Sequence, residues 1–127
     1  MPDYYIGLIS GTSMDGIDAV LVAFTDNSLV LHATHAYAYP DEFRDQLRQS
    51  ISSPDACGLD DLGELDRWTG ECFRDAALEL IGESTIDPDR IVAIGSHGQT
   101  VRHRPDAERP FSLQIGDAAT IAAGTGI

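Results

Sequence analysis

The chain has 127 residues, enough for one domain with a modest core, and its 43% hydrophobic content is ordinary for a globular protein. A net charge of -13 argues against nucleic acid or an anionic membrane as a partner, because both bind basic surfaces. No apolar run reaches the roughly 18 residues of a membrane span, and no signal-peptide pattern is present, so we expect a cytoplasmic protein.

Three apolar segments open the chain and predict a meander of strands. They cover residues 4–9, 17–24 and 29–39, and polar turn residues separate them. Pro40 then ends the strand pattern. The spacing of Phe43, Leu47 and Ile51 predicts an amphipathic helix over residues 41–52.

A long apolar stripe over residues 60–82 predicts a second helix, with Gly82 as its expected end. Asp87 and Pro88 resemble a helix cap and first-turn proline, and they lead into a short predicted strand at 91–95. Residues 111–115 and 116–123 predict a further strand and a small-residue helix. This order predicts an α/β domain, with a mixed sheet covered by helices.

Two further features concern the thiols and the chain end. Cys57 and Cys72 have no CxxC spacing and no secretory context, so we expect buried thiols rather than a disulfide. The last residue, Ile127, resembles the start of another apolar strand. We therefore expect the chain to be the first part of a longer protein.

All eight basic residues are arginines. The chain therefore has no lysine for a Walker-type loop or a Schiff base, and any bound phosphate must be held by amides, hydroxyls, arginine or metal. Arg102, Arg104 and Arg109 lie close together in sequence. They suit either an anionic ligand or a solvated loop.

The stretch "GTSMDGID", residues 11–18, is the first candidate site. Gly11 and Gly16 permit a positive φ and close approach of a ligand, and Thr12 and Ser13 add hydroxyl donors. Asp15 and Asp18 would repel a phosphate unless they bind magnesium, orient water or satisfy turn amides. Composition alone favours a plain hairpin turn of Gly, Ser and Asp residues.

The stretch "GSHGQT", residues 95–100, is the second candidate, because we expect it to follow a strand at the edge where ligands bind in α/β sheets. Its His97 and Gln99 suit the binding of sugar hydroxyls, although an isolated histidine at a turn is also a common capping or packing residue. Further along the chain, Gln114 and Asp117 could reach the same cleft. The alternative for Asp117 is capping of the following helix.

Together these stretches resemble the anhydro-N-acetylmuramic acid kinase family of bacteria. The matching segments are "IGLISGTSMDGIDAVLV", "AIGSHGQTVRH" and "LQIGDAATIAAGTGI", in the expected order and spacing over nearly the whole chain. The resemblance implies a fold of the actin, sugar kinase and Hsp70 (ribonuclease H-like) type. Residues 1–127 would then be the incomplete N-terminal lobe of a two-lobed sugar kinase, with the second lobe absent from this chain.

The resemblance also implies an activity. Such enzymes use ATP and water to open the anhydro ring of 1,6-anhydro-N-acetylmuramic acid and phosphorylate O6, giving N-acetylmuramic acid 6-phosphate in cell-wall recycling. ATP and Mg²⁺ are the implied cofactors, and a homodimer is left open. The ATP phosphate loop corresponds to Gly11, Thr12, Ser13, Met14, Asp15, Gly16, Ile17 and Asp18, with Asp15 and Asp18 as candidate metal ligands.

The sugar side corresponds to Ser96, His97, Gln99 and Thr100, together with Gln114. No catalytic residue is expected in this chain, since the family's general base is an aspartate in a downstream "GFDxGPGN"-like motif that this sequence lacks. We therefore expect the isolated chain to be inactive. The alternatives are a non-catalytic nucleotide- or sugar-binding module and another sugar kinase of the same fold.

Overall fold

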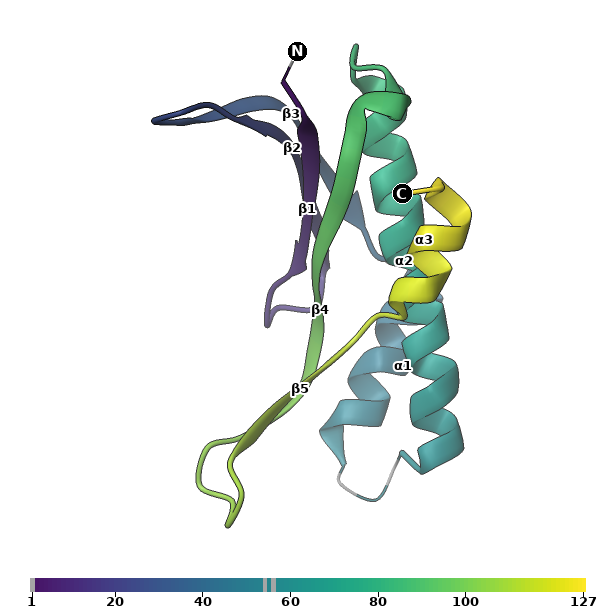
Figure 1. Cartoon of the computed structure of the whole chain (residues 1–127). Helices are drawn as coiled ribbons and strands as arrows, with labels where there is room; N and C mark the ends of the chain where they lie inside the picture. The colour runs from purple at the N-terminus through teal and green to yellow at the C-terminus, as the bar shows by residue number, and fades with distance from the viewer. Residues whose placement is uncertain (1, 54, 56) are drawn as a thin grey trace.

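A computed structural model describes residues 2–53, 55 and 57–127 and shows a five-stranded mixed sheet with helices packed on one face (Figure 1). The strands are β1 (Tyr4–Ser10), β2 (Gly16–Phe24), β3 (Leu29–Ala38), β4 (Ile91–Arg104) and β5 (Phe111–Ile115). The helices are α1 (Asp41–Ser52), α2 (Leu59–Glu83) and α3 (Ala118–Thr125), with a 3₁₀ turn, η1, at Pro88–Arg90. The α/β class with a mixed sheet and covering helices is confirmed.

The strand order in the sheet is β3-β2-β1-β4-β5. β1, β2 and β3 pair antiparallel, as the predicted meander requires, whereas β4 pairs parallel with β1. A parallel neighbour needs a crossover, and α1 and α2 provide it between β3 and β4. β5 returns antiparallel along the second half of β4.

The core lies between this sheet and α1 and α2. Alternate residues of β1 face the helices, so Tyr4, Ile6 and Leu8 are buried. Phe43 of α1 and Phe73 of α2 are completely buried against them. The predicted apolar stripe of α2 is confirmed as its core-facing side, although the helix continues through Gly82 to Glu83.

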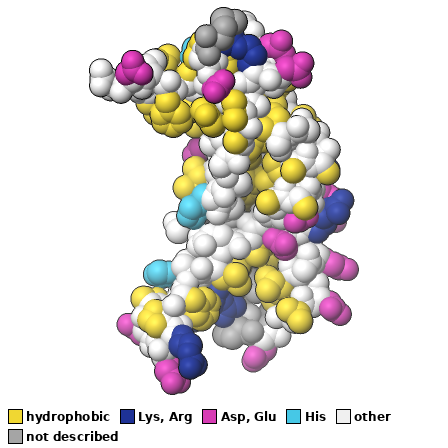
Figure 2. Space-filling view, in the orientation of Figure 1, with side chains coloured by type: hydrophobic (Ala, Val, Ile, Leu, Met, Phe, Trp, Pro, Cys, Tyr) yellow, Lys and Arg dark blue, Asp and Glu magenta, His cyan; other side chains and the backbone are white. Residues whose placement is uncertain are grey.

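The opposite face of the sheet has no helix over it in the part of the chain that the structure describes (Figure 1). Near the β2–β3 hairpin, Phe24, Leu29 and Leu31 are more than half exposed, and hydrophobic atoms gather there on the surface (Figure 2). No helix among the described residues is long and apolar enough to cross a membrane.

Two predicted boundaries differ from the structure. The strand predicted at 91–95 continues to Arg104, because a register shift opposite Leu8 and Ser10 lets β4 pass through the glycines of "GSHGQT" without ending. The helix predicted at 116–123 begins at Ala118. Asp117 caps it by accepting from the Ala119 and Thr120 amides, which confirms the capping alternative for this residue.

Both cysteines are free thiols. Cys72 is buried in the core, and burial raises its pKa to about 12, so this thiol stays protonated at neutral pH. Cys57, just after α1, is only half-buried. The prediction of thiols without a disulfide is confirmed, but the prediction of burial holds only for Cys72.

The middle of α2 passes very close to the start of α3. A Cβ atom built on Gly70 would lie 2.8 Å from the carbonyl oxygen and 2.9 Å from the amide nitrogen of Asp117. Gly63, in the same helix, has open space around the same position. Gly70 therefore allows two backbone segments to meet, whereas Gly63 only weakens the helix.

These two glycines predict opposite stability effects. Gly70→Ala should destabilise the protein by about 1–3 kcal/mol, because the methyl group overpacks the contact with Asp117. Gly63→Ala should stabilise it by roughly 0.5–1 kcal/mol, since alanine loses less backbone entropy in a helix. Thermal unfolding of both variants measures this. Equal shifts in Tm would contradict the close approach.

Candidate functional site

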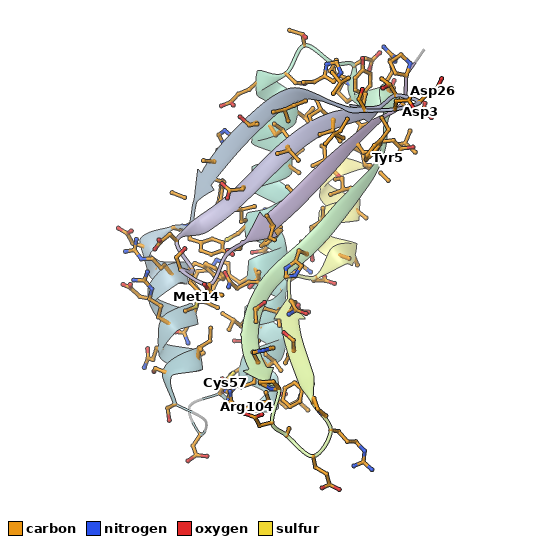
Figure 3. All side chains as sticks on the ribbon, turned by 90° about the vertical axis from the view of Figure 1, so that its left-hand side faces the viewer. Asp3, Tyr5, Met14, Asp26, Cys57 and Arg104 are labelled. Atoms are coloured by element: carbon orange, nitrogen blue, oxygen red, sulfur yellow. The ribbon has the colours of Figure 1, made fainter. Side chains whose placement is uncertain are left out.

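The connection between β1 and β2 is a tight exposed loop over residues 11–15. Its turn is closed by the Met14 amide, which donates to the Gly11 carbonyl at 3.2 Å. Met14 has a φ of 57°, an unfavourable angle for a residue with a side chain, and that side chain packs against the core. Figure 3 shows Met14 at this end of the sheet, beside the helices.

Gly11 and Gly16 lack the backbone angle that was expected of them. Neither has a positive φ; the left-handed residue is Met14. A Cβ on Gly16 would collide with the Tyr37 carbonyl, so this glycine allows β2 and β3 to pair closely. Gly11 has no atom within 4 Å of its Cβ position, so open space for a ligand lies beside Gly11.

A surface pocket of about 360 Å³ brings together most of the predicted phosphate-loop residues. Its lining comprises Gly11, Ser13, Asp15, Gly16, Ile17 and Asp18 with Ala36, Tyr37 and Ala38 of β3. Thr12 is exposed at the tip of the loop. The volume is in the usual range for small-ligand sites, and the pocket presents hydroxyl, carboxylate and backbone groups at one place.

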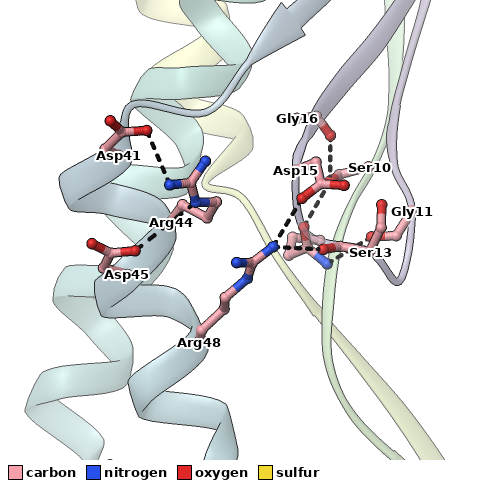
Figure 4. A network of polar contacts seen from close by, with 10 residues as sticks. Ser10, Gly11, Ser13, Asp15, Gly16, Asp41, Arg44, Asp45 and Arg48 are labelled. Carbon is pink, nitrogen blue, oxygen red and sulfur yellow. Dashed lines mark hydrogen bonds and ion pairs between the residues drawn. The ribbon is translucent and has the colours of Figure 1, made fainter.

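Arg48 of α1 reaches this loop from the helical side (Figure 4). Its guanidinium donates to an Asp15 carboxylate oxygen at 2.8 Å and to the Ser13 carbonyl at 3.3 Å. Both side chains are about half exposed or more, so the ion pair adds little stability. The contact does place the guanidinium donors of Arg48 beside the loop of an acidic, lysine-free chain.

Arg48 was not identified from the sequence, where the group Arg102, Arg104 and Arg109 drew attention instead. Arg102 and Arg104 lie on β4. Figure 3 shows Arg104 near the β4–β5 hairpin, away from Met14. In the β3–α1 connection, the Tyr39 amide donates to the Asp15 carbonyl at 3.0 Å. This bond joins the loop to the chain that leads into α1, the helix that carries Arg48. No local pattern around Arg48 predicts that contact.

Beneath the loop, a buried polar network joins the ends of three strands. The Ser10 hydroxyl lies 2.6 Å from the Gly16 carbonyl and 2.7 Å from the Gln99 side-chain oxygen. The Tyr39 hydroxyl also donates to that oxygen, at 3.1 Å. Burial raises the pKa of Tyr39 above its ordinary value, so this hydroxyl keeps its proton.

The predicted sugar-side residues lie in different surroundings. Gln99 is completely buried and bonds to the chain itself, whereas Ser96 and His97 are exposed. Ser96 lines a separate hollow of about 180 Å³ with Ile94, Ile127 and residues of α3. Thr100 accepts a hydrogen bond at 3.1 Å from the half-buried Gln114.

The chemistry of the loop pocket fits a magnesium-bound phosphate. Asp15 and Asp18 provide the carboxylate oxygens that Mg²⁺ prefers, and the site leaves space for the phosphates and water that usually complete its coordination. Within residues 2–53, 55 and 57–127 no group of three or more metal-binding side chains occurs. The protein alone would therefore supply at most two carboxylates here.

Comparisons with known proteins identify close relatives. A family profile described as "Anhydro-N-acetylmuramic acid kinase" matches residues 3–127. Curated proteins of that name from Shewanella denitrificans and Shewanella amazonensis are 51% and 52% identical over 126 and 123 residues. The alignments cover 99% and 97% of this chain but 34% and 33% of those proteins, so the chain spans about a third of their length.

The loop glycines predict another contrast. Gly16→Ala should destabilise the protein by about 1–3 kcal/mol, because its methyl group collides with the β3 backbone. Gly11→Ala should leave stability within about 0.5 kcal/mol, since nothing occupies that space. Urea unfolding of both variants tests this. A large loss of stability in Gly11→Ala would show that the space at the loop is filled.

Proposed function

Because the chain belongs to the anhydro-N-acetylmuramic acid kinase family, we propose that it forms the first lobe of a cytoplasmic enzyme with that activity. The enzyme uses ATP and water to open the anhydro ring of 1,6-anhydro-N-acetylmuramic acid and to phosphorylate O6. The product is N-acetylmuramic acid 6-phosphate. The pocket at residues 11–18, with open space beside Gly11, is the observation that supports this proposal most directly.

Phosphoryl transfer depends mainly on positioning and on neutralisation of charge. In this proposal the exposed loop, residues 11–15, holds the phosphates of ATP through its amides and hydroxyls. Mg²⁺ screens the charge of the phosphates when it is bound, and Asp15 and Asp18 hold the ion. Arg48 provides a second positive group, which already contacts Asp15 and the loop backbone.

The sugar side of the proposal rests on β4 and β5. Ser96 and His97 are exposed on β4 and are free to face a sugar, while Thr100 and Gln114 are joined by a hydrogen bond. The water that opens the anhydro ring needs a general base. The family motif that supplies this base does not occur among the 127 residues, so these residues bind and orient rather than abstract a proton.

A product assay tests the proposed activity. The protein as its gene encodes it is incubated with ATP, Mg²⁺ and 1,6-anhydro-N-acetylmuramic acid, and the phosphosugar is detected by mass spectrometry. We expect robust formation of the 6-phosphate and no phosphosugar above background from residues 1–127 alone. Phosphorylation of other sugars in preference to the anhydro sugar would point to another kinase of this fold.

Substitution of the loop carboxylates tests the magnesium ligands. Asp15→Asn and Asp18→Asn should each raise the Mg²⁺ concentration needed for half-maximal ATP binding by about tenfold, because an amide is a weaker ligand than a carboxylate. Asp45→Asn is the control, since Asp45 is an exposed carboxylate on α1 that faces Arg44 instead (Figure 4). Unchanged Mg²⁺ dependence in both loop variants would assign Asp15 and Asp18 to turn structure.

A further inference from the structure

Gln99 is among the largest completely buried side chains of this protein, yet it carries a polar amide. It comes from the "GSHGQT" segment of β4, and three of its four partners lie in or next to the loop between β1 and β2 and the end of β3. The side-chain oxygen meets the hydroxyls of Ser10 and Tyr39, at 2.7 and 3.1 Å. The side-chain nitrogen donates to the carbonyls of Gly11 and Thr100, at 3.3 and 3.1 Å.

These four contacts use the full hydrogen-bonding capacity of a carboxamide, which has two donor hydrogens and an oxygen with two lone pairs. They also determine which way the amide points. The reverse orientation would place its oxygen against two carbonyl oxygens, neither of which can donate. Glutamate would meet the same repulsion and methionine would offer no comparable donor, so glutamine is matched to this environment by chemistry as well as by size.

A bulge at Gly98 explains why the Gln99 side chain is buried although Ser96 and His97 on the same strand are exposed. Leu8 pairs with Ser96, but Ser10 pairs with Gln99, so β4 contains one extra residue between these pairs. Gly98 has a φ of 75°, and a Cβ on it would collide with the Ile115 carbonyl. The bulge thus turns Gln99 inward, toward the base of the loop.

The network holds the loop at both ends. Gln99 binds the Gly11 carbonyl, where the loop leaves β1. The Ser10 hydroxyl shares its single hydrogen between the Gln99 side-chain oxygen and the Gly16 carbonyl, where β2 begins. Tyr39, which directly follows β3, binds Gln99 through its hydroxyl and the Asp15 carbonyl through its backbone amide.

We propose that Gln99 is a positioning residue, which fixes the phosphate loop by binding Gly11 and Ser10 and does not contact the sugar. This inference rests on the proposed kinase function and refines it. The segment expected to face the sugar also sets the shape of the ATP site, since exposed Ser96 and His97 and buried Gln99 lie within four consecutive residues. Disturbance of Gln99 should therefore act on ATP.

The test uses Gln99→Met, which keeps the length of the side chain and removes its amide. Thr69→Val is the matched control. Thr69 is also completely buried, but its hydroxyl bonds within α2 to the Leu65 carbonyl, away from the loop. Amide hydrogen exchange over residues 11–16, together with the KM for ATP and for the sugar, is measured in the full-length protein.

We expect loop amides of Gln99→Met to exchange at least about tenfold faster than in the unmodified protein. The KM for ATP should rise about tenfold or more, with little change in the KM for the sugar, because displacement of binding groups by about 1 Å is costly. Thr69→Val should alter neither loop exchange nor the KM for ATP. A raised KM for the sugar with normal loop exchange would overturn the proposal and assign Gln99 to the sugar.

Ser10→Ala provides a second route if Gln99→Met does not fold. It removes the hydroxyl that joins Gln99 to Gly16 and leaves the glutamine in place, so faster loop exchange is again expected. Unchanged loop exchange in Ser10→Ala would then refute the network's role. If the unmodified protein has no kinase activity but the variants still loosen the loop, the proposed function fails while the positioning role is supported.

Discussion

The structure depends on the parallel pairing of β1 with β4, since this pairing joins a local meander to a distant strand. The buried carboxamide of Gln99 lies where that pairing ends, and it converts the contact between two strands into a fixed base for the loop. A buried amide is costly unless all its groups are paired. Here the cost is offset by four hydrogen bonds, which also make one arrangement of the loop strongly preferred.

The charge of the chain limits how its loop can bind an anion. With a net charge of -13 and no lysine, these 127 residues offer no general basic surface. An anion at this loop would have to be bound by hydrogen-bond donors close to it. The structure provides an exposed turn with Arg48 beside it. The pairing of Arg48 with Asp15 keeps a positive group at the loop without placing it inside the pocket.

Much of the fold follows from local sequence patterns. The helix predicted over residues 41–52 is α1, and the three predicted strands form the meander, because both depend on short-range periodicity of apolar residues. β4 was predicted too short. Its glycines resemble a strand end, and only pairing with β1 and β5 shows that one of them forms a bulge within a continuous strand.

Some features of the candidate site likewise follow from the sequence, and others depend on tertiary contacts. The sequence by itself determined which stretches are the candidate sites, since "GTSMDGID" and "GSHGQT" are recognisable in type and order. It also determined that none of these 127 residues contributes a lysine. Only the tertiary structure decided that Gly16 serves strand pairing, that Arg48 reaches the loop and that Gln99 points into the protein. Each of these depends on backbone atoms brought together from distant parts of the chain, and a pattern of neighbouring side chains holds no record of such contacts.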